Sequence, residues 1–166
     1  MNRFKLLGSL LALLVGGTRL AADPAMTWLT PSDPTVAPAV AKAKVTIKSL
    51  VGTLLPAVAA AVEAGGPPQG VTLCNLQANP LTQQVLEQAD PAITAVKRTS
   101  LRVRNPANAP DAAEQAALDR VAAIIAGGKE PPPLLVQSLA AAPDHPAELR
   151  VYRSMTVAPN CLACHG

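Results

Sequence analysis

The chain has 166 residues, which is the length of one domain. Hydrophobic residues make up 49% of it and charged residues 15%, so it holds enough apolar material for a buried core, and wholesale disorder is excluded. Aromatic residues make up 2%, which leaves almost no platforms on which nucleic-acid bases could stack. The formal net charge is +3.

The first 22 residues are predicted to be a secretory signal peptide, with an uncleaved N-terminal anchor as the alternative. Arg3 and Lys5 precede an apolar run at 6–15, and small residues at 20–22 suit cleavage. The run is too short to span a bilayer. We therefore expect export to the periplasm or a similar compartment, without stable membrane insertion after cleavage. Removing Arg3, Lys5 and Arg19 leaves 11 basic residues against 11 acidic ones, so no polybasic patch for nucleic acid or anionic membranes is expected.

Residues 23–33 are expected to be an irregular lead to a single domain at 34–166. A helix is predicted to begin at Asp33-Pro34, because aspartate caps helices and proline suits their first position. Apolar residues then recur at steps of three and four, as in an amphipathic helix: Val36, Val40, Ala43, Ile47, Leu50, Leu54, Val58 and Val62. Three lysines fall outside this stripe and are expected to face solvent: Lys42, Lys44 and Lys48. Pro56 is expected to kink the helix, and Gly65-Gly66-Pro67-Pro68 to end it.

The middle of the chain is predicted to contain two shorter helical stretches and a strand. One helix carries Cys74, and after an interruption at Asn79-Pro80 a second covers 81–89. Residues 92–104 are predicted to form a strand, because apolar or threonine side chains alternate with arginine and serine over 98–104.

The last third is predicted to contain one capped helix and two strands. Asp111 is expected to cap a helix over 112–126, which Gly127-Gly128 closes. Strands are predicted at 134–141 and 148–157. This order of elements predicts an α+β domain in which an antiparallel sheet is joined by a long N-terminal helix and flanking helices.

Cys161-Leu162-Ala163-Cys164-His165 is the C-x-x-C-H signature of covalent haem c attachment. The two thiols, Cys161 and Cys164, add across the haem vinyl groups as thioethers, and the spacer sets their separation. His165 follows directly and can reach the iron as the proximal ligand. The motif therefore predicts one covalently bound haem c. The alternatives are a zinc site that recruits His145 and Cys74, or a disulfide module.

The second axial ligand of such a haem is left open by the spacing. Cys74 is the remaining cysteine and is either this ligand or an inert buried thiol. The other candidates are His145, Met155 and Met26.

The sequence resembles the exported c-type haem proteins with a PAS-like fold, known from photosystem preparations and from sensor input domains. The resemblance covers about residues 36–166. It depends on Gly65-Gly66-Pro67 followed by Val71-Thr72-Leu73-Cys74, on the run 98–111, on Tyr152-Arg153 and on the final Cys161–Gly166. Family members continue past this motif with a segment that contains a further strand, whereas this sequence ends at Gly166. It is either a shortened member or a truncated reading frame, and the closure of the sheet is left open.

The resemblance implies a PAS-like fold and a six-coordinate haem whose iron is bound by His165 and, on the other side, by Cys74. An anionic thiolate favours ferric iron and lowers the reduction potential relative to a methionine ligand. A haem propionate would suit a guanidinium partner, and three arginines are candidates for it: Arg98, Arg102 and Arg104.

These features predict a monohaem cytochrome-like protein that transfers electrons or senses redox state with an unidentified redox partner. The alternatives are a haem-based CO or NO sensor, in which Cys74 dissociates, and the non-haem zinc or disulfide module. An enzyme is not expected, because a peroxidase needs distal acid–base groups and His145 is the single candidate base.

Overall fold

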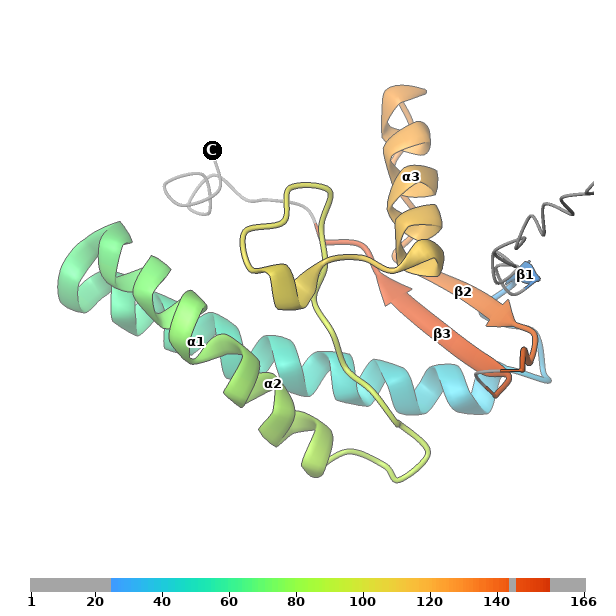
Figure 1. Ribbon diagram of the computed structural model, residues 1–166, viewed down its shortest axis with the longest axis horizontal. Coiled ribbons are helices and arrows are strands. Elements are labelled where there is room, and N and C mark those ends of the chain that lie inside the picture. Colours follow the sequence, from blue (N-terminus) through green and yellow to red (C-terminus); the bar gives the residue numbers. More distant parts are fainter. Residues whose placement is uncertain (1–24, 144–145, 156–166) are drawn as a thin grey trace, which may run out of the picture.

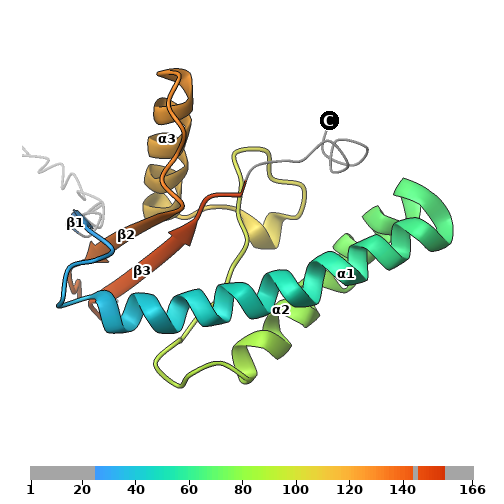
Figure 2. The ribbon, with the colours of Figure 1, turned by 180° about the vertical axis from the view of Figure 1, so that it is seen from behind.

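The computed structural model describes residues 25–143 and 146–155. It confirms the α+β prediction, with a three-stranded antiparallel sheet in the order β1-β2-β3. The strands are β1 (Met26–Leu29), β2 (Leu134–Leu139) and β3 (Glu148–Arg153), and the helices are α1 (Ala37–Leu76), α2 (Ala78–Glu87), the short 3₁₀ turn η1 (Pro106–Asn108) and α3 (Ala112–Ala126). The sheet and α3 occupy one end of the molecule, and α1 and α2 extend from it (Figures 1 and 2).

The sheet is built around β2, which pairs with β1 on one side and with β3 on the other. Val136 at its centre is buried and packs against Val36 and Val40, so the start of α1 is fixed to the sheet. β1 lies in the stretch 23–33 that was expected to be irregular, and that expectation is wrong. Four residues suffice for this strand because β2 supplies the hydrogen-bonding partner that a strand needs.

The start of α1 lies three to four residues after the predicted one. The carboxylate of Asp33 accepts hydrogen bonds from the backbone N–H of Thr35 at 2.8 Å and from its hydroxyl at 2.6 Å. Asp33 therefore closes a turn before the helix, and the helix itself begins at Ala37. The predicted apolar stripe is confirmed, since Val40 and Leu50 are buried, and the three lysines are exposed.

The break in α1 lies at Gly65 and Gly66 and not at Pro56. Gly66 has φ +70° and ψ −170°, a conformation that favours glycine, and Gly65 has φ −154°. The helix continues through Pro56 with helical dihedral angles, whereas the predicted helix end at the two glycines is confirmed. The second segment of α1 starts with Pro67 and carries Cys74, as expected.

The second helix, α2, packs on α1 through a cluster that contains Leu50, Leu54, Ala78 and Val85. It is separated from α1 by the single residue Gln77. The predicted interruption at Asn79-Pro80 is therefore wrong: proline lies in the first turn of α2, where its missing N–H has no intrahelical partner to lose.

The prediction of a strand over 92–104 is also wrong, because this segment pairs with no described strand. It runs as an extended connection that is held by side chains. Val96 packs on the α1–α2 cluster, Lys97 bonds to Glu114, and Arg98 bonds to Asn79.

The helix α3 agrees with its prediction at both ends. Asp111 accepts a hydrogen bond from the N–H of Glu114 at 2.8 Å, and the Glu114 carboxylate accepts one from the N–H of Asp111 at 2.9 Å. This reciprocal capping box is a local signal and therefore readable from sequence. The predicted strands at 134–141 and 148–157 are present as the shorter β2 and β3.

By length and composition, α1 could cross a membrane, since its best 18-residue window has a mean hydropathy of 1.8. Its first half instead packs on the sheet through Val40 and on α2 through Leu50 and Leu54. Of that window, 11% is buried inside the described fold, and a single helix that passes this test is weak evidence for a span.

Candidate functional site

The residues of the C-x-x-C-H motif lie outside the described residues, and so does His145. The structure therefore places one residue of the predicted iron-ligand pair, Cys74. Within 25–143 and 146–155, no group of three or more histidine, cysteine, aspartate or glutamate side chains could hold a metal ion. The zinc alternative draws three of its four ligands from outside these ranges, so it stays a hypothesis.

Cys74 is a free, half-buried cysteine near the end of α1, where the chain passes into α2. Residues 74–79, together with 96–99, are here named the Cys74 corner. The two segments are joined by the packing of Val96 on the cluster that contains the fully buried Ala78, and by a hydrogen bond from Arg98 to Asn79. The structure thus joins Asn79, which follows Cys74 by five residues, to Arg98.

The three candidate arginines differ in their surroundings. Arg98 is half-buried, and its Nη2 donates to Oδ1 of Asn79 at 3.0 Å. Arg102 and Arg104 are exposed. Arg98 is therefore the one of the three that is fixed in the Cys74 corner. Sequence reasoning treated Asn79 as a helix breaker and missed its polar role, although its place five residues after Cys74 was a usable signal.

Two buried polar atoms in the Cys74 corner have no hydrogen-bond partner in the described part of the chain: Nε of Arg98 and Oγ1 of Thr99. Buried polar groups are satisfied in most native structures, so each exception calls for an explanation. A ligand that accepts hydrogen bonds at this place is one such explanation.

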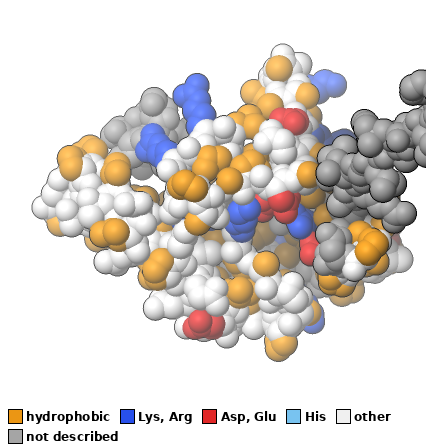
Figure 3. Space-filling model, in the orientation of Figure 1, with side chains coloured by type: hydrophobic (Ala, Val, Ile, Leu, Met, Phe, Trp, Pro, Cys, Tyr) orange, Lys and Arg blue, Asp and Glu red, His pale blue; other side chains and the backbone are white. Residues whose placement is uncertain are grey.

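Large apolar side chains are exposed on the second half of α1, on the connection after α2 and after β3. On α1, Leu76 is 65% exposed and Val71 47%. On the following connection Leu101 is 55% exposed, and after β3 Met155 is 66% exposed. Figure 3 shows hydrophobic side chains, a class that there includes alanine and proline, on the surface over the α1–α2 end of the molecule. Exposed apolar surface of this kind favours a bound apolar group or partner.

Met26, another candidate distal ligand, is engaged elsewhere. Its sulfur accepts a hydrogen bond from Nε2 of Gln137 at 3.3 Å, on the sheet. β1 lies at the opposite end of the molecule from the second half of α1 in both ribbon views (Figures 1 and 2). Met26 is therefore not a member of the Cys74 corner.

Ion pairs connect the segment 92–104 and the strand β3 to the start of α3. Nζ of Lys97 lies 2.6 Å from the buried Glu114 carboxylate, and Nη1 of Arg150 lies 2.6 Å from the Asp111 carboxylate. Burial raises the pKa of Asp111, but the N–H of Glu114 and the guanidinium of Arg150 outweigh it and hold that pKa below its ordinary value. Burial also raises the pKa of Tyr152 to about 12. These groups are paired, which is the pattern of a structural network.

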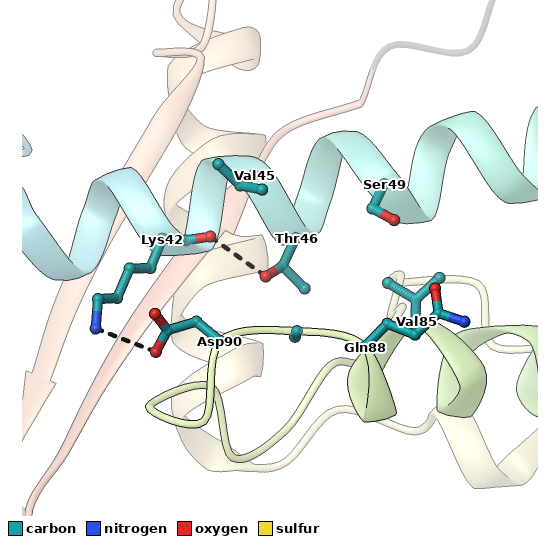
Figure 4. Close-up of a pocket in the computed structure, with 8 residues that line it drawn as sticks. Lys42, Val45, Thr46, Ser49, Val85, Gln88 and Asp90 are labelled. Carbon is teal, nitrogen blue, oxygen red and sulfur yellow. Dashed lines mark hydrogen bonds and ion pairs between the residues drawn. The ribbon is translucent and has the colours of Figure 1, made fainter.

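A pocket between α1 and the end of α2 is bordered by paired groups. Nζ of Lys42 lies 3.1 Å from Oδ1 of Asp90, and the hydroxyl of Thr46 donates to the backbone oxygen of Lys42 at 3.2 Å (Figure 4). The backbone N–H of Ala92 donates to the same Asp90 carboxylate at 2.9 Å. The polar groups at this pocket hold the turn after α2 and leave no unpaired charge for a ligand.

A comparison with protein families shows what the chain is related to. The family described as Tll0287-like matches residues 31–166, which is most of the chain. The chain belongs to the Tll0287-like family. The match supports the resemblance to cytochrome c-like and PAS-like proteins, and it includes Cys74 and the C-x-x-C-H motif within one unit. No curated protein and no solved structure matches the chain.

Proposed function

We propose that this Tll0287-like protein is an exported monohaem c-type cytochrome-like protein that transfers electrons or senses redox state. Cys161 and Cys164 hold one haem c covalently, and His165 and Cys74 bind its iron. The protein acts as a carrier or sensor and not as an enzyme, and its partner is a redox protein. The observation that carries this proposal is the C-x-x-C-H motif inside the matched stretch 31–166.

The chemistry of the described residues supports a haem at the Cys74 corner. A porphyrin needs apolar contacts for its faces, and Val71, Leu76 and Leu101 are large apolar side chains left exposed in this region. Its propionates need donors, and Arg98 carries a buried N–H without a described acceptor. Cys74 adds a thiol that no disulfide uses.

The haem supplies an iron that cycles between the ferric and ferrous states. The chain's own residues would set the reduction potential of this ferric–ferrous couple. A thiolate from Cys74 would place a negative charge on the iron and favour the ferric form, whereas a neutral methionine would favour the ferrous form. The apolar residues would exclude water, which strengthens every charge interaction at the site.

The test is to produce the full chain in a bacterium that carries the cytochrome c maturation proteins, and to purify it from the periplasm. Haem is then measured after denaturation, both by staining in a gel and by the pyridine haemochrome spectrum. We expect one haem per chain that resists extraction, and its loss in the double variant Cys161→Ala/Cys164→Ala. A colourless wild-type chain that contains zinc would overturn the proposal.

The same preparation separates the proposed function from gas sensing. Reduced protein is exposed to CO and to NO. An unchanged spectrum agrees with a stable six-coordinate iron, and a shift that requires Cys74 to leave would favour the sensor hypothesis.

A further inference from the structure

A pocket of about 190 Å³ lies in the Cys74 corner, between the start of α2, the segment 96–98 and the turn η1. Its polar lining includes Asn79, Lys97, Arg98 and Asn108. Three separate segments of the chain meet here. The pocket is far too small for a porphyrin ring, so its occupant is a small group.

The charges at this pocket do not balance. Nζ of Lys97 is neutralised by the Glu114 carboxylate at 2.6 Å and also donates to the backbone oxygen of Ala109 at 2.6 Å. Arg98, in contrast, bonds to the neutral amide of Asn79. Among the described residues no carboxylate lies within ion-pair distance of Arg98, so one positive charge at the pocket has no counter-charge.

The guanidinium also has donor capacity left. Its Nη2 is used by Asn79, whereas its Nε–H is buried without an acceptor among the described residues. A carboxylate matches the planar fork of an arginine with two parallel hydrogen bonds. A single uncompensated positive charge suits a carboxylate, with one negative charge, better than a phosphate dianion.

We propose that this pocket is a carboxylate-binding site in which Arg98 is the anchoring cation and Asn79 holds the guanidinium in place. Asn79 is a positioning residue, because its Oδ1 accepts from Arg98 at 3.0 Å and fixes one edge of the fork. The carboxylate has two sources: a propionate of the haem, in which case the inference depends on the proposed function, or a free small carboxylate such as acetate.

The experiment uses the full-length holoprotein and compares Arg98→Leu with Arg102→Leu. The control removes an exposed arginine from the same segment. The first measurement is the reduction potential as a function of pH over the range in which a carboxyl titrates. If a haem propionate occupies the pocket, Arg98 keeps it ionised to low pH, so the wild-type potential is flat there. In Arg98→Leu the propionate pKa rises and the potential becomes pH-dependent, whereas Arg102→Leu behaves as wild type.

The second measurement is the thermal midpoint with increasing sodium acetate against sodium chloride at equal ionic strength. If a free carboxylate occupies the pocket, acetate raises the midpoint of the wild type and of Arg102→Leu in a saturable way, but not that of Arg98→Leu. The proposal is overturned if Arg98→Leu and Arg102→Leu agree in both measurements. If Arg98→Leu does not fold, Arg98→Lys replaces it, because lysine keeps the positive charge but lacks the planar fork. We expect Arg98→Lys to lose at least half of the acetate-induced rise in the thermal midpoint, or at least half of the pH-independence of the potential.

Failure of this inference is distinguishable from failure of the proposed function. The pyridine haemochrome of the same sample reports whether haem is present. A colourless chain would contradict the haem proposal, and the acetate titration would still decide whether the pocket binds a carboxylate.

Discussion

The sheet end of the molecule and the Cys74 corner treat their buried polar groups in opposite ways. On the sheet, the amide of Gln137 is fully buried; it accepts from the Tyr152 hydroxyl at 2.7 Å and donates to the Met26 sulfur at 3.3 Å. In the Cys74 corner, Nε of Arg98 and Oγ1 of Thr99 are buried without a described partner. Because unsatisfied buried groups cost free energy, this contrast separates a region whose polar groups satisfy one another from a region where we propose that a ligand satisfies them.

The largest expected effect on stability is in the sheet, at the buried Gln137. Gln137→Leu leaves the half-buried Tyr152 hydroxyl without its acceptor, which costs about 2–3 kcal/mol of unfolding free energy. Urea denaturation of the full chain measures this loss. The double variant Gln137→Leu/Tyr152→Phe removes both partners and is expected to recover part of the loss. Equal stability of Gln137→Leu and wild type would show that the bond adds nothing.

The next effect concerns the cap of α3. Asp111→Ala removes both the capping box and the partner of Arg150, and we expect a loss of about 1–2 kcal/mol. Asp111→Asn is the matched control, because asparagine caps helices as well as aspartate but carries no charge. Most of the loss should return with asparagine if capping is the main contribution.

The acid limb of the stability profile tests the charge of Asp111 separately. The folded-state pKa of Asp111 lies below its ordinary 3.8, so its contribution is fully present above that value and is lost as the pH falls through the lower folded pKa. Urea midpoints measured at descending pH should therefore fall less steeply for Asp111→Asn than for wild type. Parallel slopes would mean that the Asp111–Arg150 pair adds no pH dependence.

A smaller effect is expected from the contact between α3 and β1. The guanidinium carbon of Arg120 lies 4.9 Å from the centre of the Trp28 ring. Since this contact is exposed, Arg120→Ala should cost about 0.5–1 kcal/mol. Arg120→Lys keeps a cation and should lose less. Thermal unfolding with Trp28 fluorescence as the probe measures both variants.

The smallest effect on stability is expected in the Cys74 corner. Arg98→Leu loses the bond to Asn79 but also removes an unsatisfied buried donor, so its unfolding free energy without haem should change by less than about 0.5 kcal/mol. Urea denaturation of the Cys161→Ala/Cys164→Ala background gives this value. If Arg98→Leu lost as much unfolding free energy as Gln137→Leu, Arg98 would be a structural residue like Gln137, and the two regions would not differ.

Two local signals, a helix cap and a glycine break, were readable from the sequence, whereas the pairing of β1 and the lack of pairing over 92–104 were not. The cap at Asp111 and the break at Gly65-Gly66 involve neighbours in the chain, and both predictions were confirmed. Whether residues 92–104 form a strand depends on a partner strand. Their alternation was real, but side-chain bonds to Glu114 and Asn79 fix the segment instead. β1 was missed for the converse reason, since a four-residue strand exists because β2 lies beside it.

The same distinction between local and long-range information applies to the candidate site. The C-x-x-C-H motif is contiguous, so the sequence alone was enough to predict it. The choice of Arg98 among three arginines needed the fold, because burial and the contact with Asn79 are not encoded in the alternation of 98–104.

The most direct test of the account is the ferric absorption spectrum of the matured full chain beside that of Cys74→Ser. The account places the haem iron at the Cys74 corner, so it predicts a low-spin spectrum of thiolate type in the wild type and loss of that signature in Cys74→Ser, with a higher reduction potential and the haem still covalently attached. An unchanged ferric spectrum in Cys74→Ser, with one haem per chain and wild-type helix content, would contradict it and move the search for the ligand to His145 or Met155.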